Sequence, residues 1–393
     1  MRRVNVIGVG MTKFTTPKAK IPYTDMGKEA VGDALKDAGV DFKEIEHAYT
    51  GWVYADSCAG QMVLYDFGMT GIPVFNVNNN CSTGSNALFL ARQAVATGVV
   101  ECALALGFEQ MTPGALGVVF NDRPIPMQMF FAKLFEFQPP KPGSAPAAML
   151  FGGAGMEYQQ KYGTPDETFA KISVKARKHA QHNERAVFRD LLSVEEVMDS
   201  PHQFGPLTRY QCCPPTCGAA AAVVCSDDFA AKHNITNPVY IAGHSMKTDF
   251  ASTFEGASPM RICGYDLSAA AAKEVYEQAG LGPEDVDVVE LHDCFTANEL
   301  ITYEALGLTP EGTAEKFIED GDNTYGGKYV TNPSGGLLSK GHPLGATGLA
   351  QCAELTWQLR GECGVRQVEG AKTALQHNIG LGGCCVVGMY RKD

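Results

Sequence analysis

The most constraining feature of this sequence is an internal repeat, because a chain written twice folds into two similar halves. Residues 4–11, VNVIGVGM, are echoed by residues 239–246, VYIAGHSM, and each β-branched run with glycine is typical of a buried strand. A helical pattern, a glycine and an acidic turn follow both runs. Three further pairs of segments repeat in the same order: 81–96 with 342–355, 101–107 with 373–383, and 218–225 with 382–388. We therefore expect two similar α/β halves, each with a mostly parallel sheet and buried helices.

One block has no counterpart in the second half. Residues 121–205 begin with Pro-, Met- and Phe-rich sequence and continue with a basic helix. We expect them to form an inserted domain, with 1–120 and 206–235 as the N-terminal half and 236–393 as the C-terminal half. The cationic residues of this segment are Lys171, Lys175, Arg177, Lys178, His179, His182 and Arg185. In an acidic chain such a cluster is either a solvated face or a local anion site.

Composition excludes several classes of protein. The net charge of −12 argues against a general nucleic-acid binder, which needs an excess of Lys and Arg. The thirteen cysteines are an odd number, and no signal peptide precedes them, so we expect reduced thiols in an intracellular enzyme. Cys212, Cys213 and Cys217 lack the second half of a zinc motif, so we expect apolar packing there and no metal. The sequence contains no run of about 18 apolar residues, so it predicts no membrane span.

Three short motifs occupy corresponding loops of the two halves: NNNCSTGS around Cys81, HDCF at 292–295 and GHP at 341–343. Cys81 lies just before a helix, where free backbone N–H groups and the positive dipole end favour a thiolate. It is therefore a candidate nucleophile, and its amide a candidate oxyanion donor. The alternative is a buried structural cysteine.

Histidines and a second thiol complete the candidate site. His342 stands at the repeat equivalent of Cys81, where it is a candidate base for the thiol. His292 and Cys294 follow an apolar strand, at the end where ligands gather in open α/β sheets, and Cys294 is a candidate proton carrier. The alternative is a buried cysteine beside a capping histidine. His377 precedes a glycine-rich loop that we expect to line the same cavity. The alternative is that His377 is structural.

Together with residues 6–14 and 332–348, these motifs resemble the thiolase family, in particular the thiolase domain of sterol carrier protein-X, over nearly the whole chain. The resemblance implies two similar mixed-sheet halves in a five-layered α-β-α-β-α thiolase fold with an inserted loop domain. It implies a 3-oxoacyl-CoA thiolase of the peroxisomal type, active in β-oxidation of fatty acids or sterol side chains. Cys81, deprotonated by His342, would attack the 3-oxo carbon, and acetyl-CoA or propanoyl-CoA would leave. Coenzyme A would then take the acyl group from Cys81.

Two departures from the family pattern stand out. Ordinary thiolases take their acid/base cysteine from a CxG motif, but the aligned residue here is Asn378. In the sterol-carrier type that cysteine comes from HDCF, which supports Cys294 as the proton carrier. Before its Ala run this chain has Cys217 where the family tends to have Asp, and we expect a local packing adjustment.

The resemblance also assigns binding groups. His292 and His342 would bind the oxygen of the thioester enolate, and the amides of Cys81 and Gly380 the oxygen of the tetrahedral intermediate. The basic helix would bind the phosphates of coenzyme A, and the expected contacts are Arg177, Lys178 and Arg185. Residues 124–136 would line the acyl-chain pocket, and straight, 2-methyl-branched and sterol chains stay open.

The expected assembly is a homodimer, or a dimer of dimers. A peroxisomal setting is implied by kinship alone, since no targeting tripeptide ends the chain. The sterol-carrier domain is either removed or absent from a stand-alone paralogue. Two other functions are weighed: a condensing 3-oxoacyl synthase, which the thiol at Cys294 argues against, and a non-catalytic lipid- or acyl-CoA-binding protein. The latter predicts loss of Cys81, His342 or Cys294, and all three are present.

Overall fold

Strands from both halves of the chain build the centre of the molecule. The structure is a computed structural model that describes residues 2–112, 120 and 122–393. The strands of the first half are β1 (Val4–Met11), β2 (His47–Gly51), β3 (Val74–Val77), β4 (Cys102–Glu109) and β7 (Gly218–Ser226). Those of the second half are β8 (Val239–Lys247), β9 (Val288–Glu290), β10 (Val330–Thr331), β11 (Thr373–Gly380) and β12 (Cys384–Arg391). A separate ladder joins β5 (His202–Phe204) to β6 (Leu207–Thr208).

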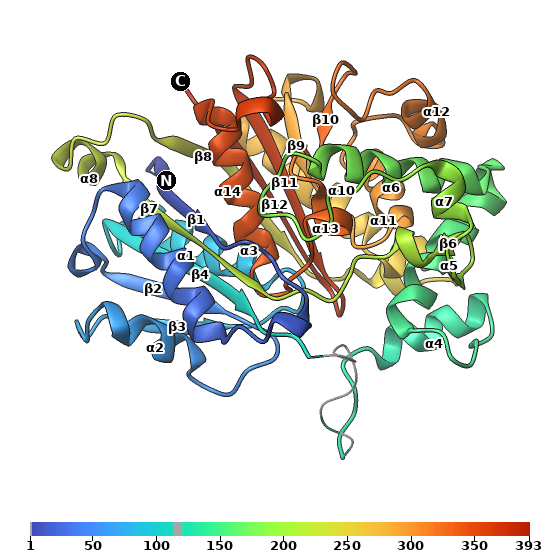
Figure 1. Ribbon diagram of the computed structural model, residues 1–393, viewed down its shortest axis with the longest axis horizontal. Helices are drawn as coiled ribbons and strands as arrows, with labels where there is room; N and C mark the ends of the chain where they lie inside the picture. The colour runs from blue at the N-terminus through green and yellow to red at the C-terminus, as the bar shows by residue number, and fades with distance from the viewer. Residues whose placement is uncertain (1, 113–119, 121) are drawn as a thin grey trace.

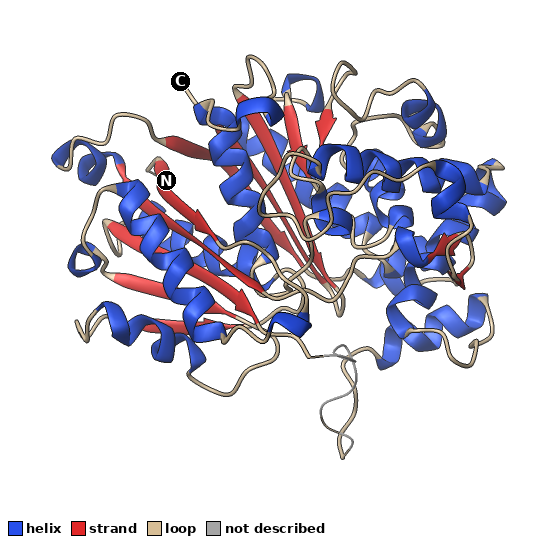
Figure 2. Cartoon of the chain, viewed as in Figure 1, coloured by secondary structure: helices blue, strands red, loops and turns tan. Residues whose placement is uncertain are grey.

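Helices cover the strands on both sides (Figure 2). In chain order they are α1 (Tyr23–Ala38), α2 (Ala59–Leu64), α3 (Thr83–Ala96), α4 (Gln128–Phe137), α5 (Pro146–Tyr162), α6 (Asp166–Ala180), α7 (Val194–Met198), α8 (Asp227–Lys232), α9 (Pro259–Ile262), α10 (Tyr265–Ala279), α11 (Thr296–Ala305), α12 (Ala314–Glu319), α13 (Gly336–Ser339) and α14 (Thr347–Arg360). Among the described residues, no helix is both long enough and apolar enough to cross a membrane.

The two halves of the sheet repeat each other, as the sequence predicts. The order β3-β2-β4-β7-β1 in the first half matches β10-β9-β11-β12-β8 in the second. Four of the five strands in each half run in the same direction, as expected, and only β7 and β12 run antiparallel to both of their neighbours. In the second half, a tight turn through Gly382 and Gly383, both with positive φ, joins β11 directly to β12. A connection this short can join only antiparallel strands, so both halves are mixed sheets.

The halves meet edge to edge as well as face to face. β1 pairs antiparallel with β8 through Asn5 with Tyr240 and Val6 with Val239. This pairing joins all ten strands into one continuous sheet (Figure 1). Each half thus covers the open edge of the other.

Three apolar clusters define the layers of the fold. Alternate residues of β4 face opposite ways: Ala103 and Ala105 belong to the central cluster, and Leu104 and Leu106 to an outer one beneath α1. The central cluster also holds α3 and α14, which pack between the two halves of the sheet. A third cluster lies where α10 and α11 cover the second half. Helix, sheet, central helices, sheet and helix follow one another, which is the layering that the resemblance implies.

The central helices approach each other closely at their first turns. A Cβ on Gly348, in α14, would overlap Ser85 in α3, and a Cβ on Gly107, in β4, would overlap the carbonyl oxygen of Gly345. Only glycine fits at these points. The loops that precede the two helices are thereby brought side by side.

The segment without a repeat partner packs on the opposite half from the one that carries it. Helices α4, α5 and α6 share an apolar cluster with α10 and α11 of the second half, and Figure 1 draws α6 beside α11. The expected start of this insertion at residue 121 lies outside the described residues. At its other end, the β5–β6 ladder extends across residue 205. The domain boundaries stay predictions.

Candidate active site

The loop between β3 and α3 holds Cys81 in a buried position. Asn80 has a positive φ of 52°, and the amides of Ser82 and Thr83 bond to the carbonyl oxygens of Asn79 and Asn80, so the chain turns tightly just before the helix. Cys81 is 9% exposed, and its thiol lies 3.6 Å from Oδ1 of Asn80. The sequence-based expectation of a cysteine just ahead of a helix is therefore met.

Two histidines from the other half converge on this thiol. His292 follows β9, and His342 lies between α13 and α14. The sulfur of Cys81 and one ring nitrogen of each histidine lie within 4.8 Å of one another. The two imidazoles meet edge to face, with centroids 4.9 Å apart and planes at 87°. The structure thus brings together three side chains that the sequence analysis selected from separate motifs.

The hydrogen bonds of His342 determine which of its nitrogens carries the proton. Its Nδ1 lies 2.6 Å from Oγ1 of Thr347, and that hydroxyl donates to the carbonyl oxygen of Pro343 at 3.0 Å. The hydroxyl therefore accepts from Nδ1–H, and Nε2 has a free lone pair. Within the described part of the chain, Nε2 is buried without a hydrogen-bond partner. Because burial lowers the pKa of His342 to about 3, the ring is neutral and Nε2 is an available base beside Cys81.

Burial keeps Cys81 protonated in the resting site. Burial, which has the largest effect, and the charge of Glu109 together raise the pKa of its thiol to about 12, against the opposite effect of the backbone amides of Leu381 and Cys81. The expectation that the helix start favours a thiolate is wrong here, because desolvation of the charged form is the larger effect. Cys81 needs a base to react.

Glu109, at the end of β4, links the nucleophile's half to the loop after His342. Its carboxylate accepts N–H bonds from Val53 at 3.1 Å, Tyr54 at 2.9 Å and Gly345 at 3.0 Å. Burial nevertheless raises its pKa to about 7, against the effect of these three amides. Sequence reasoning missed this residue, although an acid ending an apolar strand was the available signal.

The HDCF loop adds Cys294 and, unexpectedly, Cys213. Burial, then the charges on Cys213 and Cys81, raise the pKa of the Cys294 thiol well above its usual value. The amide of Cys213 donates to the carbonyl oxygen of Cys294 at 2.9 Å. Cys213, assigned to apolar packing from the sequence, is therefore a neighbour of both expected thiols. Asp293 accepts from the amides of Leu337 at 2.7 Å and Leu338 at 3.2 Å, which ties this loop to α13.

The glycine-rich end of β11 packs against the loop that holds Cys81. A Cβ on Gly380 would overlap the carbonyl oxygen of Asn79, so only glycine lets the strand approach the nucleophile loop. Both ring nitrogens of His377 have partners of their own: its Nε2 lies 2.8 Å from Oγ of Ser268, and its Nδ1 accepts from the amide of His292 at 3.4 Å. His377 therefore supports His292.

Comparisons with known proteins agree with this arrangement. A family profile described as "Thiolase, N-terminal domain" matches residues 4–228, and one described as "Thiolase C-terminal domain-like" matches residues 255–386. Sterol carrier protein 2 of Rattus norvegicus is 54% identical over 396 residues, which cover 99% of this chain and 72% of that protein. The chain belongs to the thiolase family.

Solved structures carry the same fold. The human mitochondrial 3-ketoacyl-CoA thiolase in complex with CoA matches with a TM-score of 0.73 at 19% identity, over 100% of this chain and 98% of that one. A protein described as "Ltp2-ChsH2(DUF35) aldolase" matches with a TM-score of 0.84 at 25% identity, over the same shares. The thiolase fold is thus confirmed, and the function has to be argued from the site.

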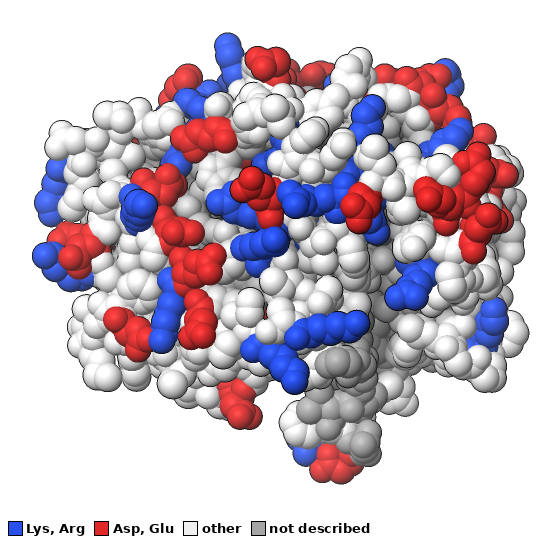
Figure 3. Space-filling model, viewed as in Figure 1, with Lys and Arg blue, Asp and Glu red and all other residues white. Residues whose placement is uncertain are grey.

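The expected coenzyme A contacts of this thiolase mostly have partners within the protein. Arg177 donates to the carbonyl oxygen of Asp190 at 3.4 Å and lies over the ring of Phe188. Arg185 donates to the carbonyl oxygen of Met11 at 3.1 Å and lies over Trp357. Lys178 is exposed. Figure 3 shows Lys and Arg side chains gathered near the middle of this face, where Figure 1 draws α14 and the segment after α6.

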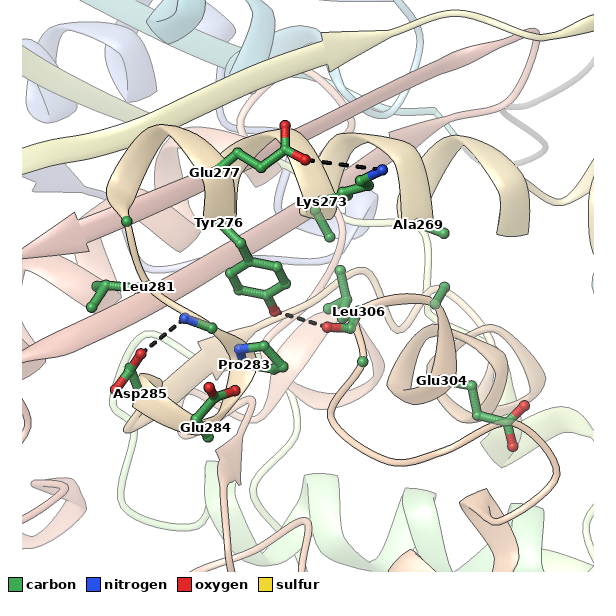
Figure 4. A pocket seen from close by; sticks show the side chains of 15 residues that line it. Ala269, Lys273, Tyr276, Glu277, Leu281, Pro283, Glu284, Asp285, Glu304 and Leu306 are labelled. Carbon is green, nitrogen blue, oxygen red and sulfur yellow. Dashed lines mark hydrogen bonds and ion pairs between the residues drawn. The ribbon is translucent and has the colours of Figure 1, made fainter.

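A surface pocket of the thiolase lies apart from the Cys81 site. It is lined by α10, the turn at 280–285 and the end of α11 (Figure 4). Within it Tyr276 donates to the carbonyl oxygen of Leu306 at 2.8 Å, and Lys273 lies 3.9 Å from Glu277. None of the expected catalytic or coenzyme A residues lines this pocket.

Cys217, the departure from the family's Asp, is buried beside the site. Its thiol lies 3.4 Å from the carbonyl oxygen of Met111, and burial, with the charge of Glu109, raises its pKa. The neutral thiol of Cys217 adds no charge beside Glu109.

Proposed function

We propose that this chain is a 3-oxoacyl-CoA thiolase that transfers an acyl group through Cys81. The observation that supports this best is the buried thiol beside the unprotonated Nε2 of His342, with Cys294 and His292 in the adjoining loop. Coenzyme A is the proposed co-substrate, since the human relative of the same fold is described in complex with it. The proposed enzyme is an acyltransferase.

In the first half-reaction, His342 takes the proton of Cys81 as the sulfur attacks the 3-oxo carbon. The amides of Cys81 and Gly380 are the proposed donors to the resulting oxyanion. Collapse breaks the carbon–carbon bond, and the leaving acetyl-CoA or propanoyl-CoA enolate is held by His292 and His342. Cys294 gives that carbanion its proton.

In the second half-reaction, the thiolate of Cys294 takes the proton of the incoming coenzyme A. The CoA sulfur attacks the acyl group, the bond to Cys81 breaks, and His342 returns the proton to Cys81. Every residue is restored. The resting thiol and imidazole are both neutral. The proton therefore passes from Cys81 to His342 only as the sulfur attacks the substrate, when the new negative charge moves to an oxygen that the amides can stabilise.

An apolar surface within the insertion supports a fatty substrate. Within α4, Phe130 and Leu134 are buried, while Met129 is 60% exposed and Phe135 is 40% exposed. We assign residues 124–136 to the acyl-chain pocket and keep 121–205 as the inserted domain. Branched and sterol chains stay the candidate substrates beside straight ones.

A homodimer through β3 is part of the proposal. β3 is an outer strand of the sheet, and an unpaired edge is a template for a second copy. Large apolar side chains surround it: Met62, Tyr65, Met69 and Phe75 are 60%, 50%, 81% and 43% exposed. A second copy would cover them. A peroxisomal setting is the location we propose for the enzyme.

The decisive experiment follows loss of the enolate absorbance of a 3-oxoacyl-CoA in the presence of coenzyme A. We expect turnover by the wild type, none by Cys81→Ala, and a severe loss in Cys294→Ala. Cys58→Ala is the matched control, because Cys58 is an exposed thiol outside the site. Trapping without coenzyme A should leave the acyl group on the peptide that contains Cys81.

The same assay separates the alternatives. Binding of acyl-CoA without turnover would support the non-catalytic lipid-binding reading, and condensation of two acyl-CoA molecules without thiolysis would support the synthase. Full activity in Cys294→Ala would refute the proton-carrier role. Straight, 2-methyl-branched and steroid-chain substrates compared by kcat/KM then decide the chain preference.

A further inference from the structure

We propose that Asn378 is a positioning residue that holds the proton of His292 on Nε2, and that this keeps the cluster of Cys81, His292 and His342 a proton-transfer site instead of a metal site. The catalytic consequence rests on the proposed thiolase function. The tautomer and the metal preference do not, because they follow from hydrogen bonds alone.

Asn378 lies at the centre of a buried polar network. It is 0% exposed, in β11. Its Nδ2 lies 3.2 Å from the carbonyl oxygen of Cys81 and 2.8 Å from Nδ1 of His292. Its Oδ1 lies 2.8 Å from Oγ of Ser85. One amide therefore joins the nucleophile's backbone, the imidazole and the first turn of α3.

Two contacts fix which end of the amide is the donor. The carbonyl oxygen of Cys81 can only accept, so the NH₂ group of Asn378 has to face it. On the other side, Oγ of Ser85 already accepts from Nε2 of Gln376 at 3.0 Å, which frees its own hydrogen to donate to Oδ1. Turning the amide over would set two acceptors against each other at Cys81.

This orientation determines the tautomer of His292. The NH₂ group has two hydrogens, one for Cys81 and one for Nδ1 of His292, so Nδ1 has to be a lone pair. Burial and the neighbouring His342 keep the ring neutral, with a pKa well below its usual value. Its one proton is therefore on Nε2. The free nitrogen of His292 is therefore a donor, whereas that of His342 is a lone pair.

Opposite tautomers matter because the cluster otherwise has the composition of a zinc site. Zn²⁺ binds cysteine sulfur and histidine lone pairs, and the three ligand atoms lie within 4.8 Å of one another. With Nε2 protonated and the lone pair of Nδ1 taken by the amide of Asn378, His292 has no free lone pair, so only Cys81 and His342 are left for a metal. An acceptor in place of the Asn378 amide would reverse this, since a carboxylate bonded to Nδ1–H turns the lone pair of Nε2 toward a metal.

The test uses Asn378→Asp, with Asn234→Asp as control for the added charge, because Asn234 is exposed and distant in the chain from every site residue. Long-range ¹H–¹⁵N spectra of histidine-labelled protein report which ring nitrogen carries the proton, with signals assigned through His292→Gln and His342→Gln. Zinc binding is measured by competition with a chromophoric chelator.

In the wild type we expect the proton on Nε2 in His292 and on Nδ1 in His342. In Asn378→Asp we expect it on Nδ1 in both, and zinc binding at least about 10- to 100-fold tighter than in the wild type or the control. Adding Cys81→Ala should abolish the gain. Loss of the N–H donor at Nε2 of His292 should lower kcat by about 100- to 1,000-fold with little change in KM.

A wild-type spectrum with the proton on Nδ1 of His292 would overturn the inference, even where the variant does not fold. A folded Asn378→Asp that binds zinc no better than the control would overturn the metal part. The spectrum needs no turnover, so it separates this inference from the proposed function. A protein with the expected tautomers and no thiolysis refutes only the function.

Discussion

Thr347→Val tests how His342 is kept as a base. Valine matches threonine in shape but removes the oxygen that accepts from Nδ1–H of His342. Both residues are almost fully buried, at 3% and 4% exposure, so no water can replace the lost acceptor. An unsatisfied buried donor costs about 1–3 kcal/mol. The imidazole can avoid this cost by moving its proton to Nε2, where it faces Cys81 and is no longer a base.

The magnitude follows from that cost. A change of about 1–3 kcal/mol in the tautomer balance is a factor of roughly 5 to 150. Since His342 acts in both half-reactions, we expect kcat/KM for thiolysis to fall by roughly 10- to 100-fold. Thr347→Ser keeps the hydroxyl and should retain most of the activity. The same two variants, compared by urea unfolding, separate the loss of the base from a loss of stability.

The result that would refute the reasoning is a Thr347→Val enzyme within about twofold of Thr347→Ser, which is less than the roughly fivefold lower bound set above. Equal, large losses in both variants would also refute it, because the methyl group and not the hydroxyl would then be the part that matters. Restored activity of Thr347→Val at high pH would point to a different base.

Four further outcomes are expected. Alkylation of Cys81 by iodoacetamide in the ligand-free protein should rise with pH without a plateau below pH 10, since its pKa is raised to about 12; a midpoint near pH 8 would contradict the burial argument. For Glu109 the folded pKa is raised from 4.5 to about 7, so its stabilising contribution is present below pH 4.5 and lost as pH rises through 7. Between pH 5 and pH 8 the wild type should therefore lose about 2–3 kcal/mol more stability than Glu109→Gln, measured by urea unfolding; equal losses in the two proteins would contradict the shift. Lys178→Glu should raise the KM for coenzyme A and leave kcat unchanged; an unchanged KM would remove Lys178 from the coenzyme A site. Phe75→Glu should give a monomeric mass by light scattering where the wild type gives a dimer, while Val365→Glu, at a more exposed residue of the second half (81% against 43% for Phe75), should not; a dimer in both variants would place the interface elsewhere.

Much of the fold was predictable because the repeat is written in local patterns. The paired runs at 4–11 and 239–246 become β1 and β8, and the paired helices become α3 and α14. Pairing of β1 with β8 was not predictable, because edge pairing depends on how two finished halves approach. The antiparallel course of β7 and β12 was missed, since a buried apolar run reads alike in either direction.

The candidate site, like the fold, was predictable from the sequence only in part. Cys81, His292, His342 and Cys294 stand in short motifs, and the structure gathers the first three around one point. The thiol's pKa could not be foreseen, because a helix start is visible in sequence whereas the depth of burial is not. Asn378 could be seen only as a missing cysteine, since its hydrogen bonds join three segments that lie far apart in the chain.

The assembly of this site from distant segments has a consequence for the life of the protein before it is complete. During synthesis Cys81 emerges long before His292, His342 and the strand that closes the site beneath it. Until those arrive, the thiol is solvated, and its pKa is that of an ordinary cysteine, so it is open to oxidants. Burial then raises that pKa and lowers its reactivity at the moment its base is delivered. Completion of the second half therefore both assembles the proposed site and protects its sulfur, so the extent of Cys81 oxidation reports how long the first half stays without the second.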